Sequence, residues 1–263
     1  MSTTLLIIDG MNLIRRIYAV QEKQNKNSQF ALSATNNTAC NALQKMLRAH
    51  QPSHVICVFD SHQKSWRHQL LSEYKQGRKP IPPVLKAYLP QIQDAFYEMG
   101  IESLVTEQDE ADDLIATLAY KVAQRQQRCI IVSTDKGFYQ LLNTYTYIYD
   151  YFQSLHIDSY FVEQKLALSI AQLTDYWAIT GTSSNIKGVE GVGNKGALIL
   201  LQQYQSLDNM LNENIDTAPN NLDKRLIKVK KHRDEALLAK QLVTLKCQIE
   251  LGFNLKDLRY QKK

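Results

Sequence analysis

The sequence predicts an α/β protein with a mostly parallel central sheet and flanking helices, followed by a smaller helical domain. Three continuous aliphatic runs are typical of strands that are buried on both faces. Helix-like segments separate these runs, and strands that alternate with helices favour parallel pairing. Beyond about residue 160 the aliphatic runs stop and helical periodicity replaces them. We therefore expect an α/β domain over residues 1–160 and a helical domain over residues 161–263.

The predicted strands are "LLIID" ending at Asp9, "VICVFD" ending at Asp60, "CIIVSTD" ending at Asp135, and a weaker "IESLV" at residues 101–105. The segment 84–100 before this last strand is predicted to be a helix that ends at Gly100. Residues 111–128 place apolar side chains on one helical stripe. Residues 21–38 are rich in Gln, Asn and Ser, so we expect a polar loop or a poorly ordered insert there.

In the second half, helices are expected at residues 169–180, 197–213 and 224–246, with a glycine-punctuated loop at 181–196. The composition, 44% hydrophobic and 22% charged, is that of an ordinary globular protein, and no apolar run approaches the roughly 20 residues of a membrane helix. The N-terminus lacks a basic leader, and four scattered cysteines indicate neither a disulfide framework nor a zinc site. We expect a cytoplasmic monomer, whose net charge of +5 permits a polyanionic partner.

Three predicted strands end in an aspartate, at Asp9, Asp60 and Asp135. Taken singly, each is best read as a turn or capping residue. In an open parallel sheet, however, catalytic groups gather beyond the carboxyl ends of the strands. The segment "DEADDL" adds Glu110, Asp112 and Asp113 at the start of a helix, although the helix dipole alone favours acids there by about 0.3 to 1 kcal/mol each.

A ring of carboxylates at one sheet edge is unstable at neutral pH unless cations hold it. Ligands that are all oxygen indicate Mg²⁺ or Mn²⁺ and disfavour zinc. Such ions above a sheet can activate water and orient a phosphate, which favours phosphodiester hydrolysis. The sequence has no GxxxxGK[ST] loop, so a nucleotide triphosphatase is disfavoured.

Five segments, in order, resemble the 5′-nuclease family, which includes the flap endonuclease domain of bacterial DNA polymerase I. They are "LLIIDGMNLIRR", "VFD...WRHQLLSEYKQGRKPIPP", "DEADDLIATLA", "VSTDKGFYQLL" and "GTSSNIKGVEGVGNKGA". The likeness is closest to the short, stand-alone exonuclease IX (Xni) branch. It implies a PIN-like catalytic core, a helical arch or clamp around residues 62–90, and a helix-three-turn-helix DNA-binding domain. It also implies that Asp112 contacts Mg²⁺ directly and that the other acids hold metal directly or through water: Asp9, Asp60, Glu110, Asp113 and Asp135.

The chain departs from polymerase-linked members at the second metal site. Gly137 stands where those proteins have an acid, and Thr182 and Asn185 stand where they have aspartates. The exonuclease IX branch shares these losses and is regarded as active, so the resemblance implies a Mg²⁺-dependent 5′ flap endonuclease with a second ion held mainly through water and phosphate. Two alternatives stay open: a DNA-binding protein with little or no catalysis, and an RNA-cutting relative, which the DNA-type hairpin disfavours.

The loop "GVEGVGNKGA" resembles a helix-hairpin-helix, in which backbone amides contact a phosphate. The expected DNA contacts there are Gly191, Val192, Gly193, Asn194, Lys195 and Gly196. The resemblance implies a K⁺ ion that bridges protein and DNA, held by the main chain of Ile179, Thr180, Lys187, Val189 and Val192. It also favours Lys75 and Arg78, in a basic cluster with Arg67 and Lys79 around Tyr74, as contacts to a single strand, and Arg15 and Arg16 near the scissile phosphate. The basic run 224–233 is expected to be a solvated helix face that can add nonspecific duplex affinity.

Overall fold

The computed structural model describes residues 3–60, 63–106, 109–213 and 223–261. The chain forms two compact units. The sheet unit comprises Met1–Gln63, Lys79–Asp158 and Lys246–Lys263, and the helical unit comprises Lys64–Arg78 and Ser159–Leu245. The predicted division at residue 160 stays a prediction. The compact units differ from it because Lys64–Arg78 belongs to the helical unit and Lys246–Lys263 belongs to the sheet unit. The predicted arch also stays a prediction, and its first residue, 62, lies outside the described residues.

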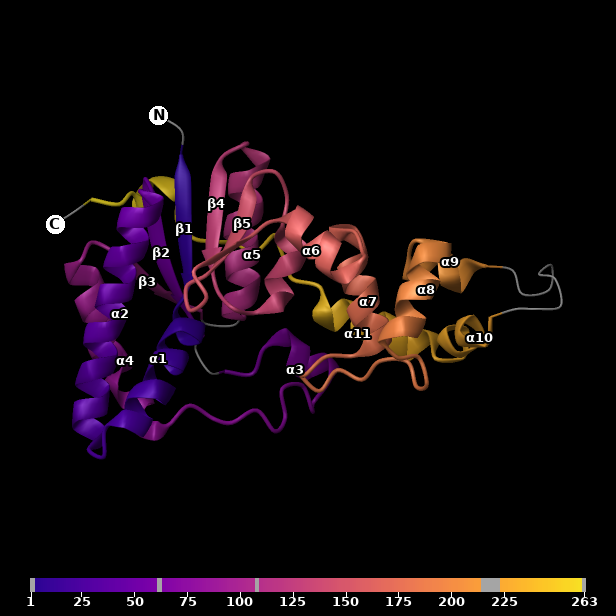
Figure 1. Cartoon of the computed structure of the whole chain (residues 1–263), viewed down its shortest axis with the longest axis horizontal. Coiled ribbons are helices and arrows are strands. Elements are labelled where there is room, and N and C mark those ends of the chain that lie inside the picture. The colour runs from indigo at the N-terminus through magenta and orange to yellow at the C-terminus, as the bar shows by residue number, and fades with distance from the viewer. Residues whose placement is uncertain (1–2, 61–62, 107–108, 214–222, 262–263) are drawn as a thin grey trace. The chain divides into compact units, whose positions relative to one another are not determined.

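Within the described residues, six strands form one sheet in the order β3-β2-β1-β4-β5-β6 (Figure 1). All neighbours pair in parallel except β5 and β6, which are antiparallel. The register sets Ile8 of β1 beside Cys57 of β2 and Val132 of β4. This arrangement confirms the predicted fold class. The strands are β1 (Thr4–Asp9), β2 (His54–Phe59), β3 (Glu102–Val105), β4 (Arg128–Val132), β5 (Thr146–Asp150) and β6 (Leu155–Ile157).

Both faces of the central strands are buried, which explains their continuous apolar sequences. Leu6 and Ile8 of β1 belong to the core cluster beneath helices α1 (Gly10–Gln24), α2 (Ser28–His50) and α4 (Pro83–Glu98). Their neighbours Leu5 and Ile7 point the other way, toward the face that α5 (Ala111–Gln124) covers. Each such side chain contributes roughly 1.5 to 3 kcal/mol through its burial.

The segment 21–38, predicted to be a polar loop or a poorly ordered insert, is helical except at residues 25–27, so that prediction is wrong. Helix α1 continues to Gln24, and α2 begins at Ser28 after Asn27, whose side chain accepts a hydrogen bond of 2.8 Å from the Gln29 amide. The polar residues occupy the outer face of α2, and its buried positions recur at helical spacing: Ala31, Leu32, Thr35, Ala39, Ala42, Leu43 and Met46.

The helical unit contains shorter helices than the sequence predicts. The expected helix 197–213 is interrupted where Gln205 takes a left-handed φ of 67° and Ser206 caps the next helix. The expected helix 224–246 divides at His232. The helices are α3 (Trp66–Leu70), α6 (Ser159–Leu166), α7 (Leu173–Thr180), α8 (Asn194–Tyr204), α9 (Leu207–Asn212), α10 (Lys224–Lys231) and α11 (Arg233–Val243). Of the helices described, none is both long and apolar enough to cross a bilayer.

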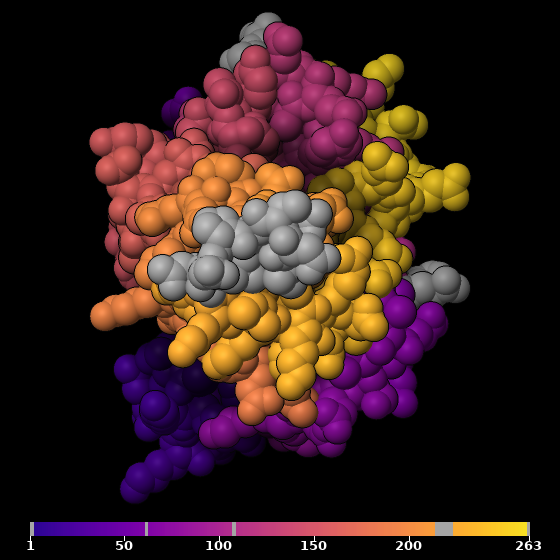
Figure 2. Space-filling model, turned by 90° about the vertical axis from the view of Figure 1, so that its right-hand side faces the viewer, coloured from indigo at the N-terminus to yellow at the C-terminus, as the bar shows by residue number. Residues whose placement is uncertain are grey.

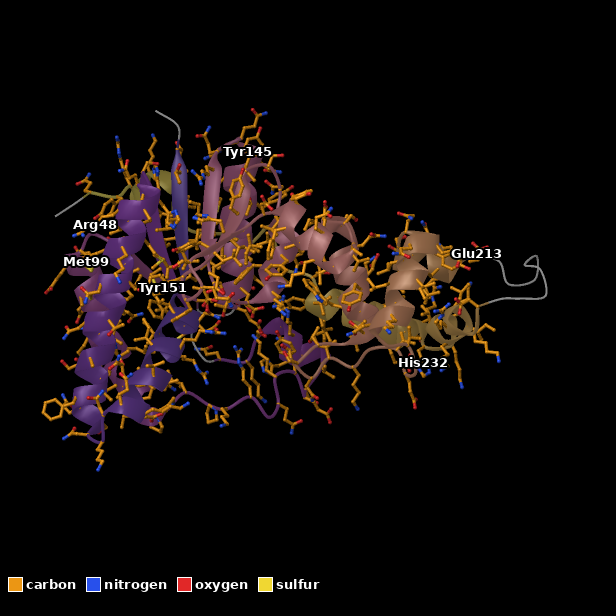
Figure 3. All side chains as sticks on the ribbon, viewed as in Figure 1. Arg48, Met99, Tyr145, Tyr151, Glu213 and His232 are labelled. Carbon is orange, nitrogen blue, oxygen red and sulfur yellow. The ribbon has the colours of Figure 1, made fainter. Side chains whose placement is uncertain are left out.

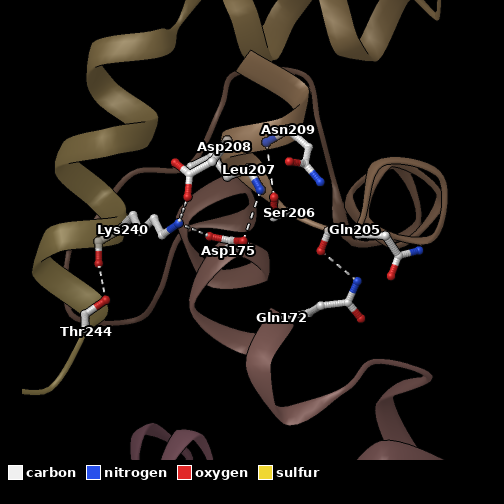
Figure 4. A network of polar contacts seen from close by, with 9 residues as sticks. All are labelled: Gln172, Asp175, Gln205, Ser206, Leu207, Asp208, Asn209, Lys240 and Thr244. Atoms are coloured by element: carbon white, nitrogen blue, oxygen red, sulfur yellow. Dashed lines mark hydrogen bonds and ion pairs between the residues drawn. The ribbon is translucent and has the colours of Figure 1, made fainter. Parts of the chain in front are cut away.

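A charge network around the buried Asp175 joins α7, α9 and α11 (Figure 4). Lys240 of α11 lies 2.9 Å from an oxygen of Asp175 and 2.8 Å from one of Asp208. Asp175 is buried, and its other oxygen accepts a bond of 3.0 Å from the Leu207 amide. Partial burial opposes the charge on Lys240, but hydrogen bonds to Asp208 and Asp175 outweigh it and raise the pKa of the amine. One side chain thus fixes three helices.

Segment 64–78 is anchored to the helical unit by Arg67. This side chain is only 1% exposed, and its guanidinium donates bonds of 2.8 Å to the Leu242 carbonyl and 3.1 Å to the Thr244 carbonyl at the end of α11. Tyr74 is buried as well. The basic cluster predicted around Tyr74 is therefore partly structural, because Arg67 satisfies backbone carbonyls inside the unit.

Candidate active site

Asp9 ends β1 at the carboxyl edge of the sheet and is only 7% exposed. One carboxylate oxygen accepts a bond of 3.0 Å from the Asn12 amide and so caps α1. The other accepts a bond of 2.8 Å from the Ser133 hydroxyl, just after β4. Gly10 is required beside it, because a Cβ there would lie 2.7 Å from the Phe59 ring. Asp9 therefore serves as a helix cap and also faces the end of the neighbouring strand.

Asp60 links the end of β2 to the start of α5. Its carboxylate accepts a bond of 2.8 Å from the Ala111 amide. Glu110, the N-cap residue of α5, makes no side-chain cap of its own, so Asp60 supplies the cap from another element. This bond brings the aspartate that follows β2 to the "DEADDL" segment.

Asp135 begins the 3₁₀ helix η1 (Lys136–Leu141) after β4. Its carboxylate accepts a bond of 2.7 Å from the Gly137 amide, and its own amide donates to the Ser133 hydroxyl at 3.0 Å. A Cβ at position 137 would lie 3.1 Å from the Asp135 oxygen, so glycine leaves room for this turn. Ser133 thus contacts both Asp9 and Asp135 and sets them on either side of one hydroxyl.

The charges of Asp60 and Asp135 both act on the carboxyl group of Asp9. The pKa of Asp9 is raised from its ordinary value of 3.8 to about 6. Burial is the largest cause, the charges of Asp135 and Asp60 add to it, and the hydrogen bonds from Asn12 and Ser133 oppose it. Burial also raises the pKa of the Cys57 thiol, with a contribution from Asp9. A carboxylate that resists ionisation beside two others is the environment that a hard cation would relieve.

The acids of α5 divide between two surroundings. Asp112 is half-buried in the first turn, and Glu110 is buried beside it. Asp113 is fully buried and accepts a bond of 2.9 Å from the Lys246 amide, in a segment where Thr117 makes further bonds. The contact with Lys246 gives Asp113 a structural role beside the catalytic one that the resemblance implies.

The described residues contain no group of three His, Cys, Asp or Glu side chains set closely enough to hold a metal ion by themselves. The donor chemistry still fits Mg²⁺, which binds one or two carboxylates and keeps several waters or substrate oxygens. The observation that supports this fit is the raised pKa of Asp9.

Three residues of the site escaped the sequence prediction. Ser133 and Asn12 position the acids, and the Asn12 side chain also accepts bonds from the Thr134 amide and hydroxyl at 3.2 and 3.1 Å. Asp150 ends β5, is buried, and together with Asp135 raises the pKa of Tyr139, which burial raises most. The alternating run "TYIYD" was the available signal for this fourth strand that ends in an aspartate.

The hairpin region lies in the helical unit. The Val189 amide donates to the Ile179 carbonyl at 2.8 Å, and the Val192 amide donates to the Val189 carbonyl at 3.1 Å. A Cβ at Gly188 would collide with the backbone of residues 179–181, so these two segments touch main chain to main chain. The structure thus brings the main chain of Ile179, Thr180 and Val189 together. Lys187 lies beside the same segment, since a Cβ at Gly181 would be 3.4 Å from its carbonyl carbon, and Val192 joins the group through its bond to Val189.

The other predicted DNA contacts fall into two groups. In the sheet unit, the Arg15 guanidinium donates to the Lys79 carbonyl at 2.7 Å, and exposed Arg16 lies 5.4 Å from the centre of the Phe152 ring. In the helical unit, the Lys75 amide donates to the Ser184 carbonyl at 2.9 Å. Arg78 is exposed, as are the loop residues Gly191, Gly193, Asn194 and Lys195, while Val192 is buried and Gly196 half-buried.

Comparison with known proteins identifies the family of the chain. Residues 4–167 match the N-terminal resolvase-like domain of 5′-3′ exonucleases, and residues 168–263 match their C-terminal SAM fold. A flap endonuclease Xni of Psychromonas ingrahamii is 64% identical over 261 residues, covering 99% of this chain and 98% of that protein. Another flap endonuclease Xni, of Aeromonas hydrophila, is 49% identical over 97% of this chain and 95% of its own length.

Solved structures show the same fold. The T5 5′-exonuclease with bound zinc ions superimposes with a TM-score of 0.75 at 19% identity, covering 92% of this chain and 90% of that one. A complex of the bacteriophage T5 flap endonuclease with DNA and metal ions gives 0.73 at 19% identity, covering 92% and 89%. The resemblance predicted from sequence motifs is confirmed, and so is the likeness to the Xni branch. The chain belongs to the 5′-3′ exonuclease family and is a nuclease.

Proposed function

We propose that this nuclease is a Mg²⁺-dependent, structure-specific 5′ flap endonuclease that hydrolyses phosphodiester bonds. The observation that carries the proposal is the group of Asp9, Asp60 and Asp135 at one sheet edge, with the pKa of Asp9 raised to about 6 by burial and by the other two charges. Relatives that are 64% and 49% identical are named flap endonucleases, which supports the choice of a branched DNA substrate.

In this proposal, Asp112 holds Mg²⁺ directly, and the remaining acids hold it directly or through water: Asp9, Asp60, Glu110, Asp113 and Asp135. When bound, the ion would lower the pKa of a bound water and stabilise charge on the scissile phosphate; Mn²⁺ could replace it. The protein's own contribution is positional. Ser133 fixes Asp9 and Asp135, and the Ala111 amide fixes Asp60, so little reorganisation is needed when the phosphate arrives.

DNA binding in this proposal is independent of base sequence. Main-chain and side-chain groups of the loop 191–196 contact phosphates of the duplex, and a K⁺ ion held by main-chain carbonyls around Ile179 and Val189 strengthens that contact. Lys75, Arg78, Arg15 and Arg16 are proposed to contact the DNA backbone. We expect K⁺ to tighten duplex binding beyond Na⁺ at the same ionic strength, and equal affinities would refute the K⁺ site.

The decisive experiment replaces Asp112 with alanine. Asp112→Ala should bind a 5′ flap substrate with nearly wild-type affinity and lose Mg²⁺-dependent cleavage. Asp94→Ala, which removes an exposed carboxylate from α4, is the matched control and should cleave normally. Unchanged cleavage by Asp112→Ala, in a preparation from which contaminating nucleases are excluded, would overturn the assignment.

A catalytically weak or inactive DNA-binding protein of the same fold is the second candidate. Two observations favour it: Gly137 stands where polymerase-linked relatives have an acid, and the described residues contain no ready cluster of three metal-binding side chains. Tight binding of a 5′ flap without turnover, across titrations of Mg²⁺ and Mn²⁺, would select this candidate. Comparing RNA with DNA flaps tests the RNA-cutting alternative; a cytoplasmic monomer remains the expectation.

A further inference from the structure

Helix α10 carries a lysine stripe on its outer face. Its buried residues, Leu226 and Val229, face the unit, while four residues at helical spacing are exposed: Lys224, Ile227, Lys228 and Lys231. In the end-on view of the helical unit, gold side chains from the region of α10 project outward (Figure 2). His232 marks the C-terminal end of the helix (Figure 3). The basic character of the run 224–231 is therefore not spread evenly around the helix.

The other basic residues of α10 are used within the protein. Arg225 forms an ion pair of 2.5 Å with Asp223, which also caps the helix. The Lys230 amine donates to the carbonyls of Leu211 and Glu213 near the end of α9. These contacts leave the charge of Lys224, Lys228 and Lys231 directed outward, and the carboxylate of Asp223 is already neutralised.

The lysine stripe adjoins the hairpin loop. The Lys228 amine donates a bond of 3.2 Å to the Gly191 carbonyl, and a Cβ at position 191 would collide with that amine. At the other end of the loop, a Cβ at Gly196 would lie 3.1 Å from the Arg225 side chain. Helix α10 thus packs along residues 191–196, where Lys195 is also exposed; Glu190 is the neighbouring exposed carboxylate.

We propose that the lysine stripe of α10 (Lys224, Lys228 and Lys231) extends the hairpin loop into one phosphate-binding surface for duplex DNA. This inference rests on the proposed function for the loop itself. A rise of about 1.5 Å per residue sets Lys224 and Lys231 about 10 Å apart along the helix, close to the axial rise of three base pairs. Flexible ammonium groups neutralise phosphates without reading bases, as a structure-specific nuclease requires.

The experiment measures duplex binding against salt concentration by fluorescence anisotropy. Each lost phosphate contact reduces the slope of log K against log salt by about 0.9, so the variant Lys224→Gln, Lys228→Gln, Lys231→Gln should lose about 2 to 3 from its slope. The matched control is Lys45→Gln, Lys86→Gln, Lys121→Gln, which removes the same charge from exposed positions of the sheet unit. A control slope equal to wild type, with a reduced stripe slope, supports the proposal.

A second variant separates charge from loop geometry. The double variant Lys224→Gln, Lys231→Gln retains the Lys228 contact with Gly191 and should still lose about 1 to 2 from the slope. Equal slopes for the double variant and the control would overturn the proposal. So would intact duplex binding together with lost binding to phosphatidylserine vesicles, because the partner would then be a membrane. Slopes are measurable whether or not flaps are cleaved, so failure of the proposed function is distinguished by the Asp112→Ala cleavage assay.

Discussion

Replacing Asp9 with asparagine should stabilise the metal-free protein while it abolishes cleavage. The folded-state pKa of Asp9, about 6, exceeds its ordinary value of 3.8, so between these values the folded protein binds more protons than the unfolded chain. Stability therefore falls as the pH rises through this window, and the full cost is present above about pH 6. Asparagine keeps the shape of the side chain and removes the charge that burial penalises.

The magnitude follows from the shift. A change from 3.8 to about 6 corresponds to about 3 kcal/mol above the window and to roughly half of that near pH 5. Asparagine retains an oxygen for the Asn12 amide, but its amide group must donate to the Ser133 hydroxyl that formerly donated to it. If this exchange costs about 1 kcal/mol, the net gain is roughly 2 kcal/mol at neutral pH.

The assay is urea unfolding in EDTA at about pH 5 and about pH 7.5 for wild type, Asp9→Asn and Asp94→Asn. The advantage of Asp9→Asn should grow by about 1 to 2 kcal/mol between the two conditions. The exposed Asp94→Asn control should stay within about 0.5 kcal/mol of wild type at both. An advantage that is equal at both pH values, or a loss of stability at neutral pH, would refute the reasoning about burial.

Two further predictions concern the helical unit. Asp175→Asn leaves the Lys240 charge without its buried partner and should lower the free energy of unfolding in urea by about 3 to 5 kcal/mol. Asp208→Asn, at the exposed end of the same network, should lower it by at most about 1 kcal/mol. Equal losses for the two variants would contradict the assigned burial. Arg67→Met should remove the bonds to the buried Leu242 carbonyl and the partly buried Thr244 carbonyl and lower the free energy of unfolding by about 2 to 4 kcal/mol. Proteolysis within segment 64–78 should increase, and a variant as stable and as resistant as wild type would exclude the anchoring role.

The sheet was predictable because its inner strands carry their signal locally. Each of the three continuous aliphatic runs ends in an aspartate, and parallel topology alone sets those ends at one edge of the sheet. β5 and β6 escaped because short strands near an edge lack a continuous apolar run. The prediction for residues 21–38 was wrong because it followed their polar composition. Their periodicity favours a helix, since Ala31, Leu32 and Thr35 follow helical spacing.

The roles of individual side chains could not be predicted where their hydrogen-bond partners are distant in sequence. Arg67 was expected to be one more basic side chain in a DNA-facing cluster, but its hydrogen-bond acceptors lie 175 and 177 residues away in the sequence. Asp113 was expected to hold metal directly or through water, but its carboxylate accepts a hydrogen bond from an amide 133 residues further on. Residue type and spacing cannot separate these roles, because both depend on which element the fold brings opposite the side chain.

The acidic edge also explains why Gly137 can stand in place of an acid. The Asp135 carboxylate is turned toward the Gly137 amide, and a Cβ at 137 would already crowd it at 3.1 Å. Another carboxylate there would add a like charge beside Asp135. Burial, and then the charges of Asp135 and Asp60, already raise the pKa of Asp9. Without that acid, the edge holds fewer mutually repelling charges while the protein is metal-free. In the proposed metal site, the glycine that leaves one acid fewer at this edge therefore also limits the electrostatic cost of folding the metal-free protein.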